Sequence, residues 1–372
     1  MRIYLDHNAT TPLAASVLDS MLPWLQGKPA NASSIHQPGR EARAALQLAR
    51  QKCADAWGCD PRRLVFTSGG TEGNNAAVKS ALDWTGKKHV ILSSIEHASI
   101  RVMGESLERS GVAVSWIPVD HLGRVDPARV TASMRDDTAL VSIMWANNET
   151  GVIQPVREIG EQCRQRGILF HTDAVQAAGK LAFRLEDEPI DLASISAHKF
   201  SGPQGVGALY IHRRIGWVPQ ILGGGQESGR RGGTENVAGV VGMGQAAAES
   251  CSDEYAALKA VRDGFETEVM ASLPDVHAHG AGAERLANTS NLCFPGRSAE
   301  ELLILLDQEG LAASAGSACS TGSLEPSPVL LAMGVKRNDA ASSVRFSFGR
   351  GQTINEAHAA ASIVIRAAGS KL

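Results

Sequence analysis

The chain has 372 residues, with 36 Lys and Arg against 39 Asp and Glu, so its formal net charge is −3 at pH 7. This near-neutral balance gives no general electrostatic attraction to nucleic acid or to an anionic membrane surface. A hydrophobic share of 43% and a charged share of 20% are typical of a globular protein and exclude intrinsic disorder as the main state. At roughly 150 residues per domain, the length predicts two domains.

The sequence contains no run that approaches the roughly 20 apolar residues of a membrane-spanning helix. The first six residues, Met1 to Asp6, include no long apolar stretch that would indicate a secretory signal. Six cysteines are scattered along the chain without a Cys-x-x-Cys pair, which argues against a disulfide framework and against a zinc ribbon. We therefore expect a soluble cytoplasmic protein that binds neither membranes nor nucleic acid directly.

Seven short apolar runs alternate with helical segments over the first part of the chain. Runs of this length are typical of buried strands, and the alternation predicts a mostly parallel sheet with helices on both faces. Only a short turn, near residues 200–205, joins the last two runs, so these two strands should be antiparallel. The runs are 64–67, 89–92, 112–119, 140–145, 168–171, 192–196 and 206–211, and helical segments between them include 72–84, 100–110 and 156–166.

After about residue 236 the pattern changes to long helices with a few short strands. Residues 246–273 have apolar residues at helical spacing and predict one long helix. We therefore expect an α/β protein with a large domain, residues 13–250, and a smaller α+β domain formed by residues 1–12 and 251–372. Its other predicted elements are strands near 291–294 and 344–348 and helices near 300–308 and 355–368.

The segment from Ser68 to Glu72, Ser-Gly-Gly-Thr-Glu, follows a strand and opens a helix. Its glycines would let backbone N–H groups approach a phosphate, and the helix dipole favours an anion there. The alternative is an ordinary strand-to-helix turn with Thr71 as a cap. The segment is not a P-loop, because the Gly-Lys-Ser/Thr ending is missing.

Two predicted strand ends carry charged residues. Asp173 follows an apolar strand, and in a parallel sheet that end faces the ligand crevice, where a buried carboxylate needs a cationic partner. Lys199, 26 positions later, also follows a strand and could act as a Schiff-base amine with a lowered pKa. The alternatives are a helix N-cap for Asp173 and a solvated surface position for Lys199.

Near the C-terminus, a cysteine and an arginine are candidates for chemistry. Cys319 lies among the small residues 315–323, which favours an exposed, reactive thiol over a buried cysteine. Arg345 alternates with the apolar residues Val344 and Phe346, so it faces the opposite side of its strand. That side is either solvent or a cleft that requires a carboxylate clamp.

Two further motifs are set aside. Residues 242–247 resemble a dinucleotide-binding fingerprint, but they lie in a helical stretch and no acidic strand end follows about 20 positions later. His277 and His279 could be half of a metal site, but no Cys, His or carboxylate cluster completes it nearby. We therefore expect a solvated loop there and no bound metal.

A phosphate cradle with an Asp and a Lys at strand ends supplies the parts that pyridoxal phosphate requires. In these parts the chain resembles the cysteine desulfurases of the iron–sulfur-assembly and nitrogen-fixation type, within the class-V aminotransferase-like, fold type I pyridoxal-phosphate enzymes. The resemblance runs from residue 4 to residue 349. Its motifs are Tyr4-Leu-Asp-His-Asn-Ala-Thr-Thr-Pro12, Thr67-Ser-Gly-Gly-Thr-Glu72, Glu96-His97, Asn147-Asn-Glu-Thr-Gly151, His171-Thr-Asp-Ala-Val-Gln176, Ser196-Ala-His-Lys199, Arg231-Gly-Gly-Thr-Glu-Asn236, Gly316-Ser-Ala-Cys-Ser320 and Val344-Arg-Phe-Ser347.

The resemblance implies roles for the residues around the cofactor ring. Lys199 would bind the cofactor aldehyde and later move protons, and Asp173 would pair with the pyridinium nitrogen. Gln176 would bond the ring hydroxyl oxygen. His97 would stack on the ring and act as an acid and base, and Asn148 would lie near the ring and the substrate.

The resemblance also implies how the phosphate and the substrate are held. Arg345 and Asn31 would clamp the substrate carboxylate, and Cys319 would accept the sulfur. The residues expected at the phosphate are Gly70, Thr71, Ser196 and His198, with Thr234 reaching in from a second subunit of a homodimer.

The implied reaction converts L-cysteine to L-alanine and leaves the sulfur as a persulfide on Cys319. The sulfur would then pass to an acceptor protein, either an iron–sulfur scaffold or a carrier of another thiolation pathway. A selenocysteine lyase would share the cofactor and much of the site, whereas Cys319 disfavours a cystine or cysteine lyase that releases pyruvate. A non-catalytic sulfur carrier or scaffold-binding subunit is disfavoured because the chain keeps both Lys199 and Asp173.

Overall fold

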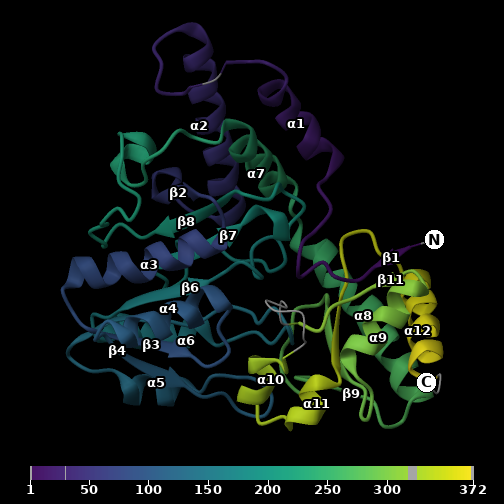
Figure 1. Cartoon of the computed structure of the whole chain (residues 1–372). Helices are drawn as coiled ribbons and strands as arrows, with labels where there is room; N and C mark the ends of the chain where they lie inside the picture. Colours follow the sequence, from purple (N-terminus) through teal and green to yellow (C-terminus); the bar gives the residue numbers. More distant parts are fainter. Residues whose placement is uncertain (1, 30, 317–324, 370–372) are drawn as a thin grey trace.

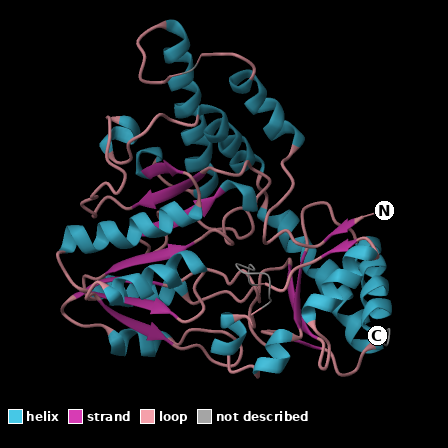
Figure 2. Cartoon of the chain, viewed as in Figure 1, coloured by secondary structure: helices cyan, strands magenta, loops and turns pink. Residues whose placement is uncertain are grey.

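The computed structural model describes residues 2–29, 31–316 and 325–369 (Figures 1 and 2). At its centre is a seven-stranded sheet with the strand order β2-β8-β7-β6-β5-β3-β4. Neighbouring strands are parallel except at β8, which is antiparallel to both β2 and β7. The predicted α/β fold and the antiparallel last pair are thus confirmed. The strands are β2 (Leu64–Thr67), β3 (His89–Ser93), β4 (Ala113–Ile117), β5 (Thr138–Ser142), β6 (Leu169–Asp173), β7 (Leu192–Ser196) and β8 (Gly207–Ile211).

Successive side chains of these strands face opposite hydrophobic clusters. On β2, Val65 joins the cluster formed with α3 and α4, whereas Phe66 joins the cluster formed with α2, α6 and α7. Because both faces are buried, the strands read as continuous apolar runs instead of alternating ones. The helices of this part are α1 (Ala15–Leu25), α2 (Gln37–Trp57), α3 (Gly70–Thr85), α4 (Ala98–Arg109), α5 (Pro127–Ser133), α6 (Val156–Gln165) and α7 (Val237–Glu249), with 3-10 turns η1 (Pro61–Arg63), η2 (Ala197–Lys199) and η3 (Gln226–Gly229).

A second group of helices and short strands lies beside the large sheet (Figure 1). Its hydrophobic cluster joins Ile3 and Leu5, from the start of the chain, to residues of the last third. This cluster supports the division into residues 13–250 and residues 1–12 with 251–372, which we keep as a proposal. The elements are β1 (Ile3–Tyr4), α8 (Ser252–Ser272), β9 (His277–Ala278), β10 (Thr289–Cys293), α9 (Ala299–Gln308), β11 (Leu311–Ala312), α10 (Pro328–Ala332), α11 (Arg337–Ala341), β12 (Ser343–Ser347) and α12 (Ile354–Gly369).

The single long helix predicted for residues 246–273 is wrong. The structure has two helices, since α7 ends at Glu249 and α8 begins at Ser252. Ser250 and Cys251 between them have extended backbone angles, and the Ser250 hydroxyl donates to the carbonyl of Ala247 at 2.8 Å. This local hydrogen bond competes with continuation of the helix. In the described part of the chain, no helix combines the length and apolar character needed to cross a membrane.

The solvated loop expected around His277 and His279 is also wrong. His277 lies in β9, which pairs with β10 in the three-stranded antiparallel sheet β12-β10-β9. His279 is only 6% exposed, and its backbone N–H donates to the carbonyl of Asn291 at 2.8 Å. The sequence interpretation missed this strand because β9 is only two residues long and takes its position from pairing with the next strand, β10.

Gly244 lies where α7 packs closely against α2, and Gly264 on α8 provides an open helical position for comparison. A Cβ atom added at Gly244 of α7 would lie 2.7 Å from the Cα atom of Ala49 on α2, whereas a Cβ added at Gly264 of α8 would meet nothing within 4 Å. We expect Gly244→Ala to lower the free energy of unfolding by about 1–3 kcal/mol, because the backbone of α2 must move. Gly264→Ala should instead raise it by about 0.5–1 kcal/mol. Thermal unfolding of both variants measures this difference, and equal midpoints would contradict the close packing.

Candidate active site

A cavity of about 770 Å³ lies between the large sheet and the smaller sheet. It receives the ends of β6 and β7, in keeping with the rule that ligands bind at the carboxyl ends of parallel strands. Ten of the residues expected to form the site line this one cavity. They are Gly70, Thr71, His97, Asn148, Asp173, Gln176, Ser196, His198, Lys199 and Arg345.

Two other expected residues, Asn31 and Thr234, are not among the described residues that line the cavity. Asn31 is exposed, and its side-chain oxygen accepts a hydrogen bond from the backbone N–H of Ser33 at 2.9 Å. Asn31 lies in the loop after α1, and this short-range hydrogen bond occupies its side chain. Asn31 and Arg345 of the same chain are therefore not brought together. Thr234 is also exposed, and Cys319 lies outside the described residues.

One end of the cavity has the features of an anion site. The N-terminus of α3, a helix of 16 residues, opens onto it at Gly70 and Thr71. A Cβ atom at Gly70 would lie 2.6 Å from the Cγ2 atom of Val175, so a larger residue does not fit this turn. An adjoining hollow of about 460 Å³ shares Gly70, Thr71, Ser196 and His198 with the main cavity. Free N–H groups and the helix dipole at this end favour a phosphate.

The amine of Lys199 is held at the end of β7 by main-chain oxygens. Its Nζ atom donates to the carbonyls of Asn8 and Ala9, both at 2.7 Å. Burial, assisted by the positive charge of Arg345, lowers the pKa of Lys199 to about 8, although Asp173 and Asp6 partly oppose this shift. The amine can therefore lose its proton near neutral pH, as a Schiff-base amine must.

The carboxylate of Asp173 is buried and oriented by two donors. Its Oδ2 atom accepts from the side-chain amide of Asn74 at 2.7 Å, and its Oδ1 atom accepts from the backbone N–H of Val175 at 3.0 Å. Asn74 also donates to the hydroxyl of Ser99 at 2.8 Å, and this hydroxyl lies 2.8 Å from Nδ1 of His97. A continuous hydrogen-bonded chain thus links His97 to Asp173. The backbone N–H of Ser99 donates to the same Nδ1 atom, so His97 also caps α4.

A second amine, Lys180, lies behind Gln176. Its Nζ atom donates to the side-chain oxygen of Gln176 at 2.6 Å and to that of Asn8 at 2.9 Å. Complete burial, and then the charges of Lys199 and Arg345, lower the pKa of Lys180 well below its usual value. Because Lys180 occupies the amide oxygen of Gln176, the amide nitrogen of Gln176 faces the other way, where it donates to the carbonyl of Asn8 at 3.0 Å.

Arg345 reaches the cavity from β12 and is only 3% exposed. It donates to the carboxylate of Asp6 at 2.7 Å and to the carbonyl of Asn148 at 3.0 Å. Its Nε atom is buried without a hydrogen-bond partner among the described residues. An unsatisfied guanidinium donor at a cavity wall is suited to a carboxylate ligand.

Glu96 contributes a buried carboxyl group to the cavity wall. One oxygen accepts from the Ser93 hydroxyl at 2.6 Å and from the Met144 backbone N–H at 2.8 Å. The other oxygen has no partner in the described part of the chain. Burial, with a smaller effect of Asp173, raises the pKa of Glu96 to about 8, so the carboxyl group is largely protonated at neutral pH.

The sequence interpretation missed several residues that organise this site: Asp6, Asn8, Asn74, Glu96 and Lys180. Asp6, Asn8 and Glu96 lie inside motifs that the sequence analysis singled out, so their positions were noted without a role. Asn74 and Lys180 lie just beyond two such motifs. They lie four positions after Gly70 and Gln176 respectively, and the sequence analysis gave neither residue a role.

The donor set of the cavity fits pyridoxal phosphate. A low-pKa amine, an oriented carboxylate and an anion-binding helix terminus face the same space, and these groups match the aldehyde, the ring nitrogen and the phosphate of the cofactor. Lys199 and Asp173 lie on neighbouring strand ends, as predicted, which is the arrangement that lets one planar ring reach both.

Comparisons with known proteins agree with this geometry. Residues 3–359 match the family described as aminotransferase class-V. A protein from Dictyoglomus turgidum named cysteine desulfurase IscS is 46% identical over 93% of this chain and 89% of its own length. A solved structure titled NIFS-like protein superposes with a TM-score of 0.91 at 35% identity, over 98% of this chain and 99% of that one. A structure titled SspA in complex with cysteine has a TM-score of 0.84 at 35% identity, over 95% and 100% of the two chains.

The raised pKa of Glu96 makes a testable contribution to stability. Because the folded protein holds this proton more tightly than the unfolded chain, the contribution of Glu96 to stability is fully present below about pH 4.5 and is lost as the pH rises to about 8. Glu96→Gln keeps the acceptor oxygen but cannot ionise. We expect its stability relative to wild type to improve by on the order of 1–4 kcal/mol between pH 5 and pH 8.5.

Thermal unfolding of wild type and Glu96→Gln at both pH values measures this effect. The matched control is Glu161→Gln, which changes an exposed glutamate on α6 and should show the same offset at both pH values. An offset for Glu96→Gln that does not change with pH would show that Glu96 ionises normally in the folded protein.

Proposed function

The chain belongs to the class-V aminotransferase family, and we propose that it acts as a cysteine desulfurase, which takes the sulfur from L-cysteine and releases L-alanine. The observation that carries this proposal is the convergence of Lys199, Asp173 and Arg345 on one cavity. These groups can hold pyridoxal phosphate and the carboxylate of an amino acid together. The relatives that match are named as cysteine desulfurases, so a selenocysteine lyase or a non-catalytic sulfur carrier is not favoured.

When bound, the cofactor supplies an electron sink for bond changes at the α- and β-carbons of the amino acid. Asp173 would keep the proton on the ring nitrogen, and the donors Asn74 and Val175 hold its carboxylate in place. Gln176 would donate from its amide nitrogen to the ring hydroxyl oxygen, since Lys180 occupies its amide oxygen. His97 would stack on the ring and Asn148 would lie beside it.

The phosphate would be held at the N-terminus of α3, where backbone N–H groups and hydroxyls converge. Burial and the positive charges of Lys199 and Lys180 lower the pKa of His198 to about 4, so its imidazole is neutral and can donate only one hydrogen bond. The expected phosphate ligands from this chain are Gly70, Thr71, Ser196 and His198, which all border the smaller hollow at this end.

Lys199 is the group best suited to move protons. Its pKa of about 8 lets the amine accept and release a proton near neutral pH. Main-chain carbonyls of Asn8 and Ala9 hold the Nζ atom without competing for the proton, since a carbonyl is not basic at this pH. Lys199 would therefore take the proton from the substrate α-carbon and return it during turnover.

Arg345 would bind the substrate carboxylate by exchanging partners. Its guanidinium is paired with Asp6, and its buried Nε donor has no partner among the described residues. A substrate carboxylate would satisfy this donor and weaken the pair with Asp6. Asn31 could join this clamp only across a subunit interface, because it is absent from the cavity of its own chain.

Cys319 would be the sulfur acceptor. The described residues on either side of its segment, Gly316 and Glu325, both line the cavity. We therefore propose that the Cys319 thiol reaches a substrate bound in this cavity. The Cys319 thiolate would attack the substrate sulfur, so that a sulfur–sulfur bond forms as the carbon–sulfur bond breaks, and a persulfide remains on the protein.

The proposal predicts that Cys319→Ala separates cofactor binding from sulfur transfer. The variant should bind pyridoxal phosphate and change its visible spectrum with L-cysteine, but its rate of alanine formation should fall by at least about 100-fold, because the nucleophile is gone. Alanine and sulfide are measured together in the presence of a reductant. Cys251→Ala is the matched control, since Cys251 is a partly exposed cysteine outside the cavity.

A Cys319→Ala variant that still formed alanine at a rate near wild type would rule out this mechanism. The lyases that release pyruvate are distinguished in the same assay, because they would form pyruvate in place of alanine. Lys199→Ala serves as the second control and should lose the cofactor spectrum as well as the activity.

We also propose that the active form is a homodimer in which Thr234 completes the phosphate site of the partner. Thr234 is exposed and does not line the cavity of its own chain. Its segment is nevertheless tied to the phosphate end, because Arg231 forms an ion pair with Glu72 of α3 at 2.9 Å. Thr234 lies three residues beyond this ion pair, and we propose that its exposed hydroxyl contacts the phosphate site of the second copy.

Mixing an impaired variant with an inactive one tests this arrangement. Thr234→Ala should weaken cofactor retention without unfolding the protein, and Lys199→Ala should abolish activity. If Thr234 acts across the interface, a mixed dimer of the two variants contains one site with both Lys199 and Thr234 intact. Wild-type cofactor affinity and activity should then return at up to half of the sites. Mixed dimers in which no site regains wild-type cofactor affinity, or an active monomer in sedimentation, would refute a shared site.

The acceptor of the sulfur is a further part of the proposal. We infer an acceptor protein, either an iron–sulfur scaffold or a thiolation carrier, because a protein persulfide must be discharged by another thiol or by a reductant. A cytoplasmic location suits this chemistry, since thiols stay reduced there.

A further inference from the structure

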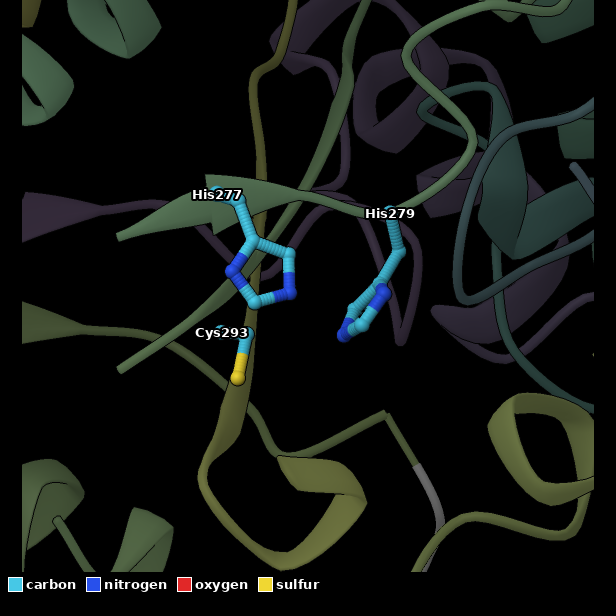
Figure 3. A group of neighbouring side chains, drawn as sticks. All are labelled: His277, His279 and Cys293. Carbon is cyan, nitrogen blue, oxygen red and sulfur yellow. The ribbon is translucent and has the colours of Figure 1, made fainter. Parts of the chain in front are cut away.

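Three side chains with metal-ligating groups meet on the small sheet, outside the cavity of the proposed active site. They are His277, His279 and Cys293 (Figure 3). One ring nitrogen of each histidine and the Sγ atom of Cys293 all lie within 4.8 Å of one another. We propose that these residues bind a zinc ion. This site is independent of the proposed desulfurase chemistry, since none of the three residues lines the active-site cavity.

Strand pairing sets the positions of all three residues. His277 on β9 is directly opposite Cys293 on β10, and His279 is anchored two residues later by its backbone hydrogen bond to Asn291. Residues two apart on a strand point to the same side, so His277 and His279 face the same way. Figure 3 shows their rings next to each other with the Cys293 sulfur close by. Main-chain pairing of this kind preorganises ligands better than a loop does.

The Ser343 hydroxyl helps to fix the ring of His279. It donates to the carbonyl of Asp339 at 2.6 Å and lies 3.0 Å from the Nε2 atom of His279. Ser343 is directly opposite Cys293 in the pairing of β12 with β10, so this contact directs the His279 ring toward Cys293.

The surroundings suit a soft divalent cation. Two imidazoles and a thiolate are ligands that zinc prefers over magnesium or calcium, and three protein ligands leave a fourth position for water. Burial raises the pKa of Cys293 to about 11, so zinc binding must displace the thiol proton, which leaves to solvent as the Zn–S bond forms. The carboxylate of Asp339 is close enough to influence both Cys293 and His279, and its charge favours a cation there.

The three ligand atoms need to move only a short distance to coordinate a zinc ion. Ligand atoms around tetrahedral zinc lie roughly 3.5 Å apart, given Zn–N and Zn–S distances near 2.1 and 2.3 Å. The three atoms must therefore close by about 1 Å, and the exposed side chain of His277 would rotate toward the buried pair, away from its 3.5 Å contact with the carbonyl oxygen of Asp275. A zinc ion there would fasten β9 to β10. It would thereby brace the sheet that carries Arg345, which lies two residues from Ser343 on β12.

Zinc titration of the full chain with its cofactor tests the proposal. Protein stripped of metal by a chelator competes for Zn²⁺ with a coloured zinc indicator, and all samples carry Cys319→Ala so that this thiol does not bind zinc. We expect one zinc per chain, and His277→Ala should weaken the affinity by about tenfold or more, since one of three ligands is lost. The matched control is His121→Ala, which removes another exposed histidine and should leave zinc binding unchanged.

Cobalt substitution gives a second readout of the ligand set. Co²⁺ should produce the visible absorption of a tetrahedral cobalt–thiolate centre, and Cys293→Ser should abolish it while thermal unfolding confirms that the variant is folded. Equal zinc affinity in the His277→Ala and His121→Ala proteins would overturn the proposal. So would a cobalt spectrum that survives Cys293→Ser, because the metal would then be bound elsewhere.

Discussion

The side chain and main chain of Asn8 connect the parts of this protein on which the site depends. Asn8 is only 1% exposed, and its polar groups are engaged on all sides. Any movement of Asn8 would leave several buried polar groups unpaired, at a cost of about 1–3 kcal/mol for each. The amine of Lys199 and the strand that carries Arg345 are thus held in one frame. The partners of Asn8 are Asn148, Gln176, Lys180, Lys199, Asn288, Thr289 and Ser347.

The buried cationic groups of the cavity favour anionic ligands. Lys180, Lys199 and Arg345 lie close enough to affect the pKa of the two lysines, and the acidic groups that act on Lys199 or Arg345 include Asp173, Asp6 and Glu149. A cofactor phosphate and a substrate carboxylate would each interact favourably with these cationic groups. Burial, together with repulsion from the neighbouring positive charges, lowers the pKa of both lysines, which suits Lys199 to act as a nucleophile and base. Glu96, protonated by burial, adds no opposing charge at neutral pH.

The sequence by itself determined the elements of the large sheet and the end of the sheet at which chemistry occurs. The seven apolar runs correspond to the seven strands of the large sheet, because a strand that is buried on both faces needs apolar residues along its whole length. Asp173, Lys199 and Gly70 could be predicted for the cavity, since each lies where a strand ends or a helix begins. These features depend on local pattern and on the general geometry of parallel sheets, and a single sequence contains both.

Only the tertiary structure decided which distant residues meet. Asn8 bonds to Lys180 across 172 positions and Asn74 bonds to Asp173 across 99, and no local pattern encodes such separations. The register of β9 on β10 brings His277 to Cys293, although the sequence interpretation took the histidines for a solvated loop. The break between α7 and α8 lies at Ser250 and Cys251, whose extended backbone angles hydrophobic spacing cannot reveal. Side-chain partners follow from how packed elements align, whereas the elements themselves follow from hydrophobic periodicity.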